Sequence, residues 1–262
     1  MCCFAAIQFK LAESLVERRM NQGPNSETIK TAIDWNTFAA NQTYFDDPPG
    51  FQFDAEAYGW THFSTSNKTQ GIVYGNGTLK VLLVGNSYAY REFSTLLKLY
   101  EGRFKEFRIF VALGCRIQSV PKRCQGFRDA YETILEKSRP DVTFFTSRDS
   151  AIITNELTSN VSEDPTFLVM KDVLEPVSRY SGVIVYEYQY HQTPWKHRGV
   201  AGIIAQRLSD RNYFLLDMNA SWEEHLKTFD AALKRQDALP FNNLIRSRVD
   251  EELCAEDSGI CY

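Results

Sequence analysis

The chain has 262 residues, of which 44% are hydrophobic and 24% are charged, a composition typical of a folded globular protein and not of a disordered one. Its formal net charge of -4 leaves no surplus of basic side chains, which argues against nucleic acid or an anionic membrane surface as a partner. No segment reaches the roughly eighteen consecutive apolar residues that a membrane-spanning helix needs.

The first 78 residues carry the weakest pattern. Apolar residues recur at helical spacing from Phe4 to Leu15, which predicts a helix within residues 1–20. The start lacks the basic region and the long apolar region of a signal peptide, so we interpret this helix as the exit from a membrane helix that precedes the sequence. Residues 21–78 are rich in Asn, Thr, Gly and Pro and are expected to form an irregular, glycosylated arm.

From residue 79 onward, short apolar runs alternate with longer segments of helical periodicity. The apolar runs are nearly continuous, which is typical of strands buried on both faces of a parallel sheet. Five strands are expected, at Lys80–Gly85, Phe107–Leu113, Val142–Ser147, Gly182–Tyr190 and Asn212–Met218.

Helices are expected between these strands. Asp164-Pro165 places an N-cap before a proline at the first helical position, and Ser221 with Glu224 forms a capping box for a helix that ends near residue 236. Apolar residues also recur at i, i+3, i+4 and i+7 in residues 93–100 and in residues 127–135. Residues 79–262 are therefore expected to form one α/β domain, a three-layer αβα sandwich with a mostly parallel five-stranded sheet.

Sequons and cysteines indicate the compartment. Five N-x-Ser/Thr sequons without proline occur, at Asn41, Asn67, Asn76, Asn160 and Asn219. Together with six cysteines, they favour an oxidising, glycosylating environment on the lumenal or extracellular side of a membrane. A cytosolic protein with free buried thiols is the alternative.

The spacing of the cysteines favours two short disulfide loops. Cys115 is close to Cys124 in the sequence, and Cys254 is close to Cys261. Each bridge would stabilise the fold by about 2–3 kcal/mol in the loop-entropy account. The chain has no Cys/His spacing of a metal site, so neither a metal nor another cofactor is expected.

The first predicted strand ends on Gly85-Asn86-Ser87. In a doubly wound sheet, ligands bind beyond the carboxyl ends of the strands. Ser87 is expected there, at the start of a helix whose free backbone N–H groups and dipole favour a developing oxyanion. Ser87 is therefore either a nucleophile or simply the N-cap of that helix. The motif is not the G-x-S-x-G nucleophile elbow, because Ala89 stands in place of the second glycine.

Val84-Gly-Asn-Ser-Tyr-Ala89 after an apolar strand resembles the first block of the SGNH (GDSL-like) hydrolase superfamily. It is more similar to the SGNH domains that follow the membrane domain of acyltransferase-3 family proteins, including nematode-type versions with Asn in place of Asp. The resemblance covers residues 80–262 and implies an SGNH/flavodoxin-like fold. It also implies that Ser87 is the nucleophile and that the backbone N–H groups of Ser87 and Gly114 form the oxyanion hole.

Two blocks depart from the family pattern. Arg148 stands where the third block has an asparagine; Arg148 and Asn86 are candidate substrate contacts, and a surface pair of Arg148 with Asp149 is the alternative. None of the four histidines completes the Asp-x-x-His block that supplies the catalytic base. In the family a short cysteine pair precedes that block, so we expect the block beyond Tyr262. If the chain is complete, His191 is the fallback base, because it follows the fourth strand at the carboxyl edge.

The resemblance implies an extracytoplasmic domain of an acyltransferase-3-like membrane protein. Its membrane domain would deliver an acyl group, and the serine would transfer that group to a hydroxyl acceptor such as a glycan, or hydrolyse an ester. The alternatives are a free-standing esterase that uses Ser87 with His191, and a catalytically inactive SGNH-fold binding module. No nucleic-acid partner is expected.

Overall fold

The computed structural model describes residues 30–34, 37, 48–63, 69–115, 117, 124–188, 205–206, 208–210, 220–247, 254–255 and 260–261. They belong to two compact units. The first unit consists of Met1–Tyr44, Tyr190–Lys227 and Val249–Tyr262, and the second of Phe45–Gln189 and Thr228–Arg248. Residues 79–189 and 228–248 of the expected α/β domain belong to the second unit.

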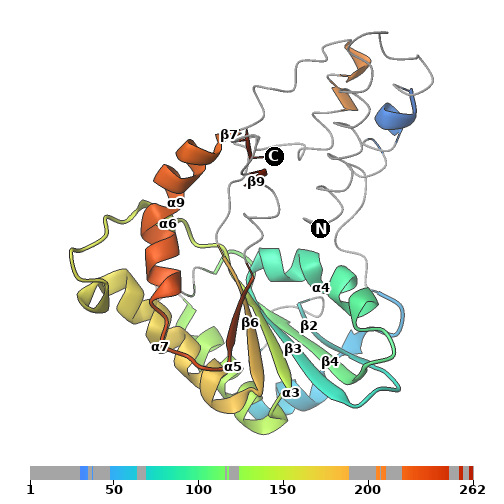
Figure 1. Ribbon diagram of the computed structural model, residues 1–262. Helices are drawn as coiled ribbons and strands as arrows, with labels where there is room; N and C mark the ends of the chain where they lie inside the picture. Colours follow the sequence, from blue (N-terminus) through green and yellow to red (C-terminus); the bar gives the residue numbers. More distant parts are fainter. Residues whose placement is uncertain are drawn as a thin grey trace. The chain divides into compact units, whose positions relative to one another are not determined.

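The second unit is built on a seven-stranded sheet with the order β1-β2-β4-β3-β5-β6-β8 (Figure 1). The strands are β1 (Gln52–Phe53), β2 (Gln70–Tyr74), β3 (Leu79–Gly85), β4 (Phe104–Val111), β5 (Val142–Thr146), β6 (Val183–Glu187) and β8 (Leu244–Ser247). Strands β4, β3, β5, β6 and β8 are parallel to each other. Beyond β4, strand β2 and then β1 extend the sheet, each antiparallel to its neighbour. The α/β class and the mostly parallel sheet are confirmed, whereas the predicted count of five strands is wrong by two.

The additional strands come from the segment expected to be an irregular arm. Between residues 48 and 78 the described chain forms β1, the helix α3 (Ala55–Thr61) and β2. Arg108 of β4 explains why this segment is ordered, because its buried guanidinium pairs with Asp54 and Glu56 and lies over the ring of Trp60. A buried cation requires such partners, and they come from a segment whose own apolar pattern is weak.

The fifth parallel strand also differs from the prediction. It is β8, whereas the predicted strand at Asn212–Met218 lies outside the described residues. Strand β8 is short and forms the edge of the sheet, where Leu244 is buried but Ile245 is 55% exposed. It therefore lacks the continuous apolar run by which a strand buried on both faces is recognised.

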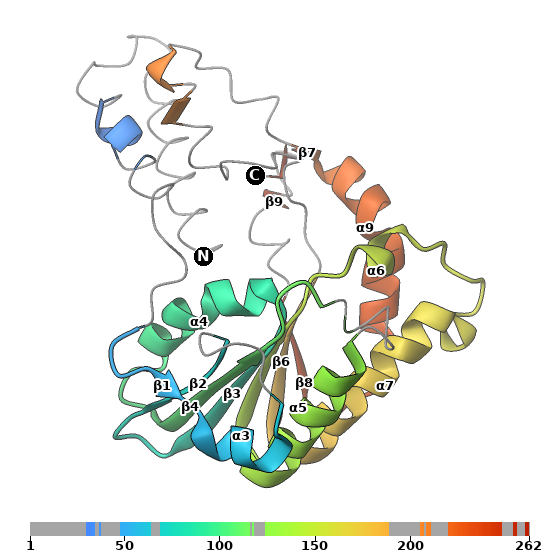
Figure 2. The ribbon, with the colours of Figure 1, turned by 180° about the vertical axis from the view of Figure 1, so that it is seen from behind.

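Helices cover both faces of the sheet, which gives three layers (Figure 2). Helix α4 (Ser87–Leu99) packs Phe93 and Leu97 against Leu83 and Ile109 on one face. The other face is covered by α3, α5 (Gln125–Ser138), α7 (Pro165–Tyr180) and residues of α9 (Trp222–Asp237). The short helices α6 (Ser150–Thr154) and η2 (Val161–Glu163) connect β5 to α7.

The helix signals read from the sequence are largely confirmed. Asp164 caps α7 by accepting a hydrogen bond from Phe167 N, and Pro165 is the first helical residue. Helix α9 begins directly after Ser221. The N-terminal helix expected in residues 1–20 lies outside the described residues.

The described part of the first unit contains a small antiparallel sheet with the order β7-β10-β9, formed by β7 (Ala220–Ser221), β9 (Cys254–Ala255) and β10 (Ile260–Cys261). Cys254 and Cys261 are direct register partners in it, a placement consistent with the predicted bridge; their side chains lie outside the description. None of the described helices is long and apolar enough to cross a membrane.

Candidate functional site

The candidate site lies at the carboxyl edge of the parallel strands, where the chain reverses its direction of winding. From β3 the chain passes through α4 to β4 on one side, whereas from β4 it passes through α5 to β5 on the other side of β3. The ends of β3 and β5 therefore form a topological switch point, the place where ligands bind in open α/β sheets. Asn86 and Ser87 follow β3, and Ser147 and Arg148 follow β5.

Gly85 allows these two strand ends to come together. It is the register partner of Thr146 in β5. A Cβ atom on Gly85 would lie 1.7 Å from the carbonyl oxygen of Thr146 and 2.9 Å from the Cβ of Ala89. The strand therefore ends on glycine because a side chain has no space between β5 and the first turn of α4.

Asn86 connects the ends of three strands. Its Oδ1 accepts a hydrogen bond from Tyr88 N (3.2 Å), which caps α4. Its Nδ2 lies within hydrogen-bond distance of the carbonyl of Cys115 (3.2 Å), Oγ of Ser147 (3.2 Å) and the carbonyl of Arg148 (2.8 Å). Only 4% of Asn86 is exposed. Its amide is thus engaged inside the protein, and a substrate contact, as predicted for Asn86, would have to replace one of these bonds.

Ser87 is the first residue of α4 and is partly buried. The side-chain cap of the helix is Asn86, so the alternative in which Ser87 is merely the N-cap does not describe this helix. The first turn of a helix leaves backbone N–H groups without intrahelical partners. Ser87 therefore lies at the positively polarised N-terminus of α4, at the switch point.

Gly114 reaches the same edge from β4. It has a φ of +72° and open space around its Cβ position, so glycine is required here by backbone conformation and not by crowding. The turn is tied to the start of α5 by a disulfide between Cys115 and Cys124, with a Cα–Cα distance of 6.0 Å. This disulfide is one of the two pairs predicted from spacing. Because β4 neighbours β3, Gly114 and Ser87 lie at adjacent strand ends.

Arg148 follows β5 and turns toward α4. Its guanidinium carbon is 5.6 Å from the centroid of the Tyr88 ring, a cation–π distance. Its Nη1 is shielded from solvent and has no hydrogen-bond partner among the described residues. The alternative of a surface pair with Asp149 is not what the structure has, because Asp149 is fully buried and caps α6 by accepting from Ala151 N.

Two glutamates at this edge were not identified from the sequence. Thr146 Oγ1 donates to Glu92 Oε2 at 2.9 Å, and Glu187 is the last residue of β6. Burial, and then the negative charge of Glu92, raise the pKa of Glu187 well above its ordinary value. Burial likewise raises the pKa of Glu92. The position of Glu187 at a strand end was the one signal that could have suggested it.

The fallback base predicted from the sequence is His191. His191 lies outside the described residues, and of the other histidines only His62 has a described side chain; it is exposed at the end of α3. Among the described residues, no three His, Cys, Asp or Glu side chains are arranged to hold a metal ion.

A small polar groove of about 170 Å³ lies between α5 and α7, away from the switch point. Both arginines that line it pair with lining carboxylates, Arg128 with Asp172 and Arg179 with Glu175. We do not regard it as the functional site, because both of its arginines are already paired and its lining comes from α5 and α7 and not from the carboxyl ends of the strands. No family model, curated protein or solved structure matches the chain.

Proposed function

We propose that the chain contains an SGNH/flavodoxin-like domain whose Ser87 acts as a nucleophile in O-acyl transfer or ester hydrolysis. The parallel strands support the fold, because their order β4-β3-β5-β6-β8 corresponds to the 2-1-3-4-5 order of flavodoxin-like sheets. The observation that carries the function is the place of Ser87. It is the first residue of α4 at the switch point, and Asn86 performs the capping that serine often provides.

The proposed reaction has two steps. Oγ of Ser87 attacks the acyl carbonyl while a base accepts the hydroxyl proton, and the backbone N–H groups of Ser87 and Gly114 stabilise the oxyanion. Collapse of the tetrahedral intermediate expels the donor oxygen, which takes up the proton and leaves an acyl-serine. A hydroxyl acceptor, such as a glycan, or water then attacks the acyl-serine and regenerates Ser87. The base is either His191 or a histidine of an Asp-x-x-His block outside this sequence.

This chemistry fits an extracytoplasmic domain of an acyltransferase-3-like membrane protein, in which a membrane domain supplies the acyl group. No metal or organic cofactor enters the scheme. The supporting features on the chain are the exposed sequons at Asn76 and Asn160 and the Cys115–Cys124 bridge, since disulfides persist in oxidising compartments.

A serine-directed fluorophosphonate probe tests the nucleophile. We expect the label on the peptide that contains Ser87, and its loss in Ser87→Ala, because an activated hydroxyl next to two N–H donors reacts where ordinary serines do not. The measurement is peptide mass spectrometry of the chain and of the natural full-length protein. Ser150→Ala is the matched control, because Ser150 is also the first residue of a helix with an Asx cap.

The outcomes separate the alternatives. Labelling of Ser87 in the chain alone would identify a base within it and favour the esterase with His191. Labelling only in the full-length protein would favour the acyltransferase. Absence of labelling in both, or equal labelling of Ser87 and Ser150, would contradict the proposal and leave the inactive binding module.

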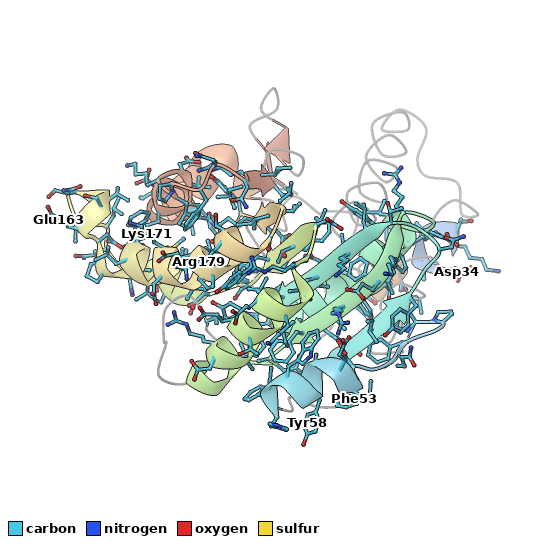
Figure 3. The ribbon with its side chains drawn as sticks, turned by 90° about the horizontal axis from the view of Figure 1, so that it is seen from below. Asp34, Phe53, Tyr58, Glu163, Lys171 and Arg179 are labelled. Carbon is cyan, nitrogen blue, oxygen red and sulfur yellow. A yellow bond between two sulfur atoms is a disulfide. The ribbon has the colours of Figure 1, made fainter. Side chains whose placement is uncertain are left out.

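Two sequons on the second unit allow a test of the compartment. Asn76, in the β2–β3 turn, and Asn160, before η2, are both exposed. Asn160 Oδ1 accepts from Ser162 Oγ (2.8 Å), and Asn160 Nδ2 donates to Glu163 Oε1 (3.0 Å); Figure 3 shows Glu163 at the outer end of this part. We expect glycans at both sequons when the chain passes through a eukaryotic secretory pathway.

Electrophoresis with and without an endoglycosidase measures this expectation. Asn160→Gln should remove one glycan-dependent step in mobility, and so should Asn76→Gln. Asn155→Gln should change nothing, because Asn155 is not in a sequon and its side chain donates to Thr166. Unmodified Asn160 in a correctly folded secreted chain would contradict the prediction.

A further inference from the structure

The side chain of Asn86 joins the two segments that carry the backbone N–H groups used in the proposed reaction. Its Oδ1 accepts a hydrogen bond at 3.2 Å from the N–H of Tyr88, the residue after Ser87. Its Nδ2 donates at 3.2 Å to the carbonyl of Cys115, the residue after Gly114. One planar amide therefore connects the start of α4 to the turn that follows β4, next to both oxyanion donors.

Both segments are also held by contacts that do not involve this amide. Cys115 is bonded through its disulfide to Cys124 at the start of α5, and its N–H donates to the carbonyl of Ala112 at 3.2 Å. On the other side, the backbone N–H of Asn86 donates to the carbonyl of Thr146, the last residue of β5, at 3.3 Å. What the side chain of Asn86 adds is therefore the position of one segment relative to the other.

The contacts of this side chain require an amide. The N–H of Tyr88 can only donate a hydrogen bond, whereas the carbonyls of Cys115 and Arg148 can only accept one. A carboxylate has the same shape as the amide, but it would present an oxygen without a proton to two carbonyl oxygens. Because only 4% of Asn86 is exposed, the lost hydrogen bonds would not be replaced readily by bonds to water.

We propose that Asn86 is a positioning residue that sets the spacing of the two oxyanion donors, the N–H groups of Ser87 and Gly114, by bonding the residue that follows each of them. Its role in catalysis rests on the proposed function of Ser87, whereas the coupling of the two N–H groups through Asn86 does not. Oxyanion donors act at about 2.7–3.1 Å from the developing charge, and a displacement of about 1 Å lowers a rate about 100-fold. A side chain that fixes their separation therefore controls the rate without touching the substrate.

Asn86→Asp tests this inference, because it keeps the shape and the capping oxygen of Asn86 and removes only the donor. The measurement is the rate of fluorophosphonate labelling at Ser87, which should be about 100-fold lower in the variant at about pH 8. Burial beside two carbonyls raises the pKa of the introduced carboxyl, and its protonated form donates a hydrogen bond. The ratio of variant rate to natural rate should therefore be at least about tenfold higher at about pH 5 than at about pH 8, the change that one pKa unit produces.

Asn160→Asp is the matched control, because Asn160 Oδ1 accepts from Ser162 N at the same distance of 3.2 Å but at an exposed position. Produced in a host that adds no glycans, this variant should be labelled at the natural rate at both pH values. Asn86→Ser is the second variant. Serine still caps a helix, but its hydroxyl is one bond shorter than the amide and does not bridge to Cys115, so labelling should be about 100-fold slower at both pH values.

Two-dimensional NMR separates this inference from the proposed function. In Asn86→Asp the amide signals of Ser87 and Gly114 should shift with pH at one common midpoint that the natural chain does not show. The amide of Ser150, the first residue of α6, should not follow it. If both amides share this midpoint but Ser87 is never labelled, in the chain or in the full-length protein, the positioning role stands and the proposed function fails.

Natural labelling rates in Asn86→Asp and Asn86→Ser, or the absence of a common midpoint for the two amides, would overturn the inference and leave the proposed function untouched. Where Asn86→Asp does not fold, Asn86→Ser decides, by its labelling rate and by the change in the amide signal of Gly114. An unchanged rate and an unchanged Gly114 signal in Asn86→Ser would show that Asn86 caps α4 and does nothing more.

Discussion

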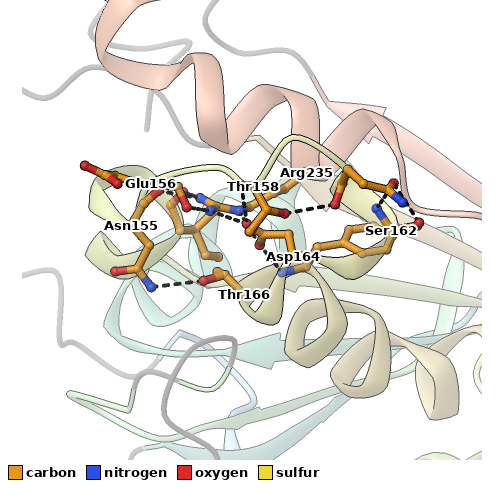
Figure 4. Close-up of polar contacts among 10 residues, drawn as sticks. Asn155, Glu156, Thr158, Ser162, Asp164, Thr166 and Arg235 are labelled. Atoms are coloured by element: carbon orange, nitrogen blue, oxygen red, sulfur yellow. Dashed lines mark hydrogen bonds and ion pairs between the residues drawn. The ribbon is translucent and has the colours of Figure 1, made fainter.

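Replacement of Arg235 with methionine should destabilise the second unit by about 3–5 kcal/mol, because it leaves a buried carboxylate without its counterion. Arg235 and Asp164 are 0% and 1% exposed. Nε and Nη2 of Arg235 each donate to one oxygen of Asp164 at 2.8 Å, as Figure 4 shows. The same guanidinium donates to the carbonyls of Ile152, Asn155 and Glu156. Arg235 of α9 thus donates hydrogen bonds to carbonyls at and after the end of α6 and to the carboxylate that caps α7.

Urea-induced unfolding measures this loss. Lys234→Met is the matched control, because Lys234 is the neighbouring residue and its pair with Asp230 is exposed; exposed pairs contribute about 0–1 kcal/mol. Arg235→Met combined with Asp164→Asn should recover part of the loss, since the uncompensated charge is removed while the amide oxygen still caps α7. Equal stability of Arg235→Met and Lys234→Met would show that the buried pair does not support the fold.

The same pair sets the acid limit of stability. The hydrogen bond from Arg235 lowers the pKa of Asp164 to about 2, from 3.8. A carboxyl with a lowered folded pKa stabilises the protein above its unfolded pKa and ceases to do so as the pH falls through the folded value. Asp164 therefore stabilises the folded state above about pH 4, and this contribution is lost as the pH falls toward about 2. We expect the unfolding free energy of the natural chain, measured by urea unfolding at a series of pH values, to fall over this acidic range.

Local patterns predicted the centre of the sheet and little of its edges. Strands β3 to β6 were found because each contains a run of apolar residues, as strands at the centre of a parallel sheet do. Strands β1 and β8 are short and form the two edges of the sheet, and β2 lies next to β1. The segment that holds β1 and β2 depends on partners distant in sequence, such as the contacts of Arg108 with Asp54 and Glu56. A window of neighbouring residues does not contain that information.

The candidate site, too, could be predicted only in part. Ser87 and Gly114 could be placed at the carboxyl edge because each follows a recognisable strand. Glu92 and Glu187 could not be placed there, since they belong to different elements and no spacing rule joins a helix residue to a strand end. The role of Asn86 was also hidden, because its partners Cys115 and Ser147 become neighbours only when β4 and β5 flank β3.

Gly85→Ala should cost about 3 kcal/mol, the upper range for forcing an extra carbon into a packed interior. The added Cβ would lie 1.7 Å from the carbonyl oxygen of Thr146. Both groups are held by the backbone, so neither can turn away, and β3 must move from β5. That movement separates Asn86 from Ser147 and Arg148, so the N-terminus of α4 loses its support. We therefore expect both lower stability and the loss of any probe reactivity at Ser87.

Gly59→Ala is the control that separates crowding from the general effect of adding a methyl group. Gly59 lies within α3, and no described atom apart from its chain neighbours and its own helix backbone lies within 4 Å of its Cβ position. Alanine there should stabilise the protein by about 0.5–1 kcal/mol, because it restricts the unfolded chain and favours the helix. Opposite signs for the two substitutions in urea unfolding would show that the glycine before Asn86-Ser87 serves the close approach of β3 to β5. A neutral Gly85→Ala would show that the strand ends can separate without loss, and would remove the structural reason for a glycine at the start of the site.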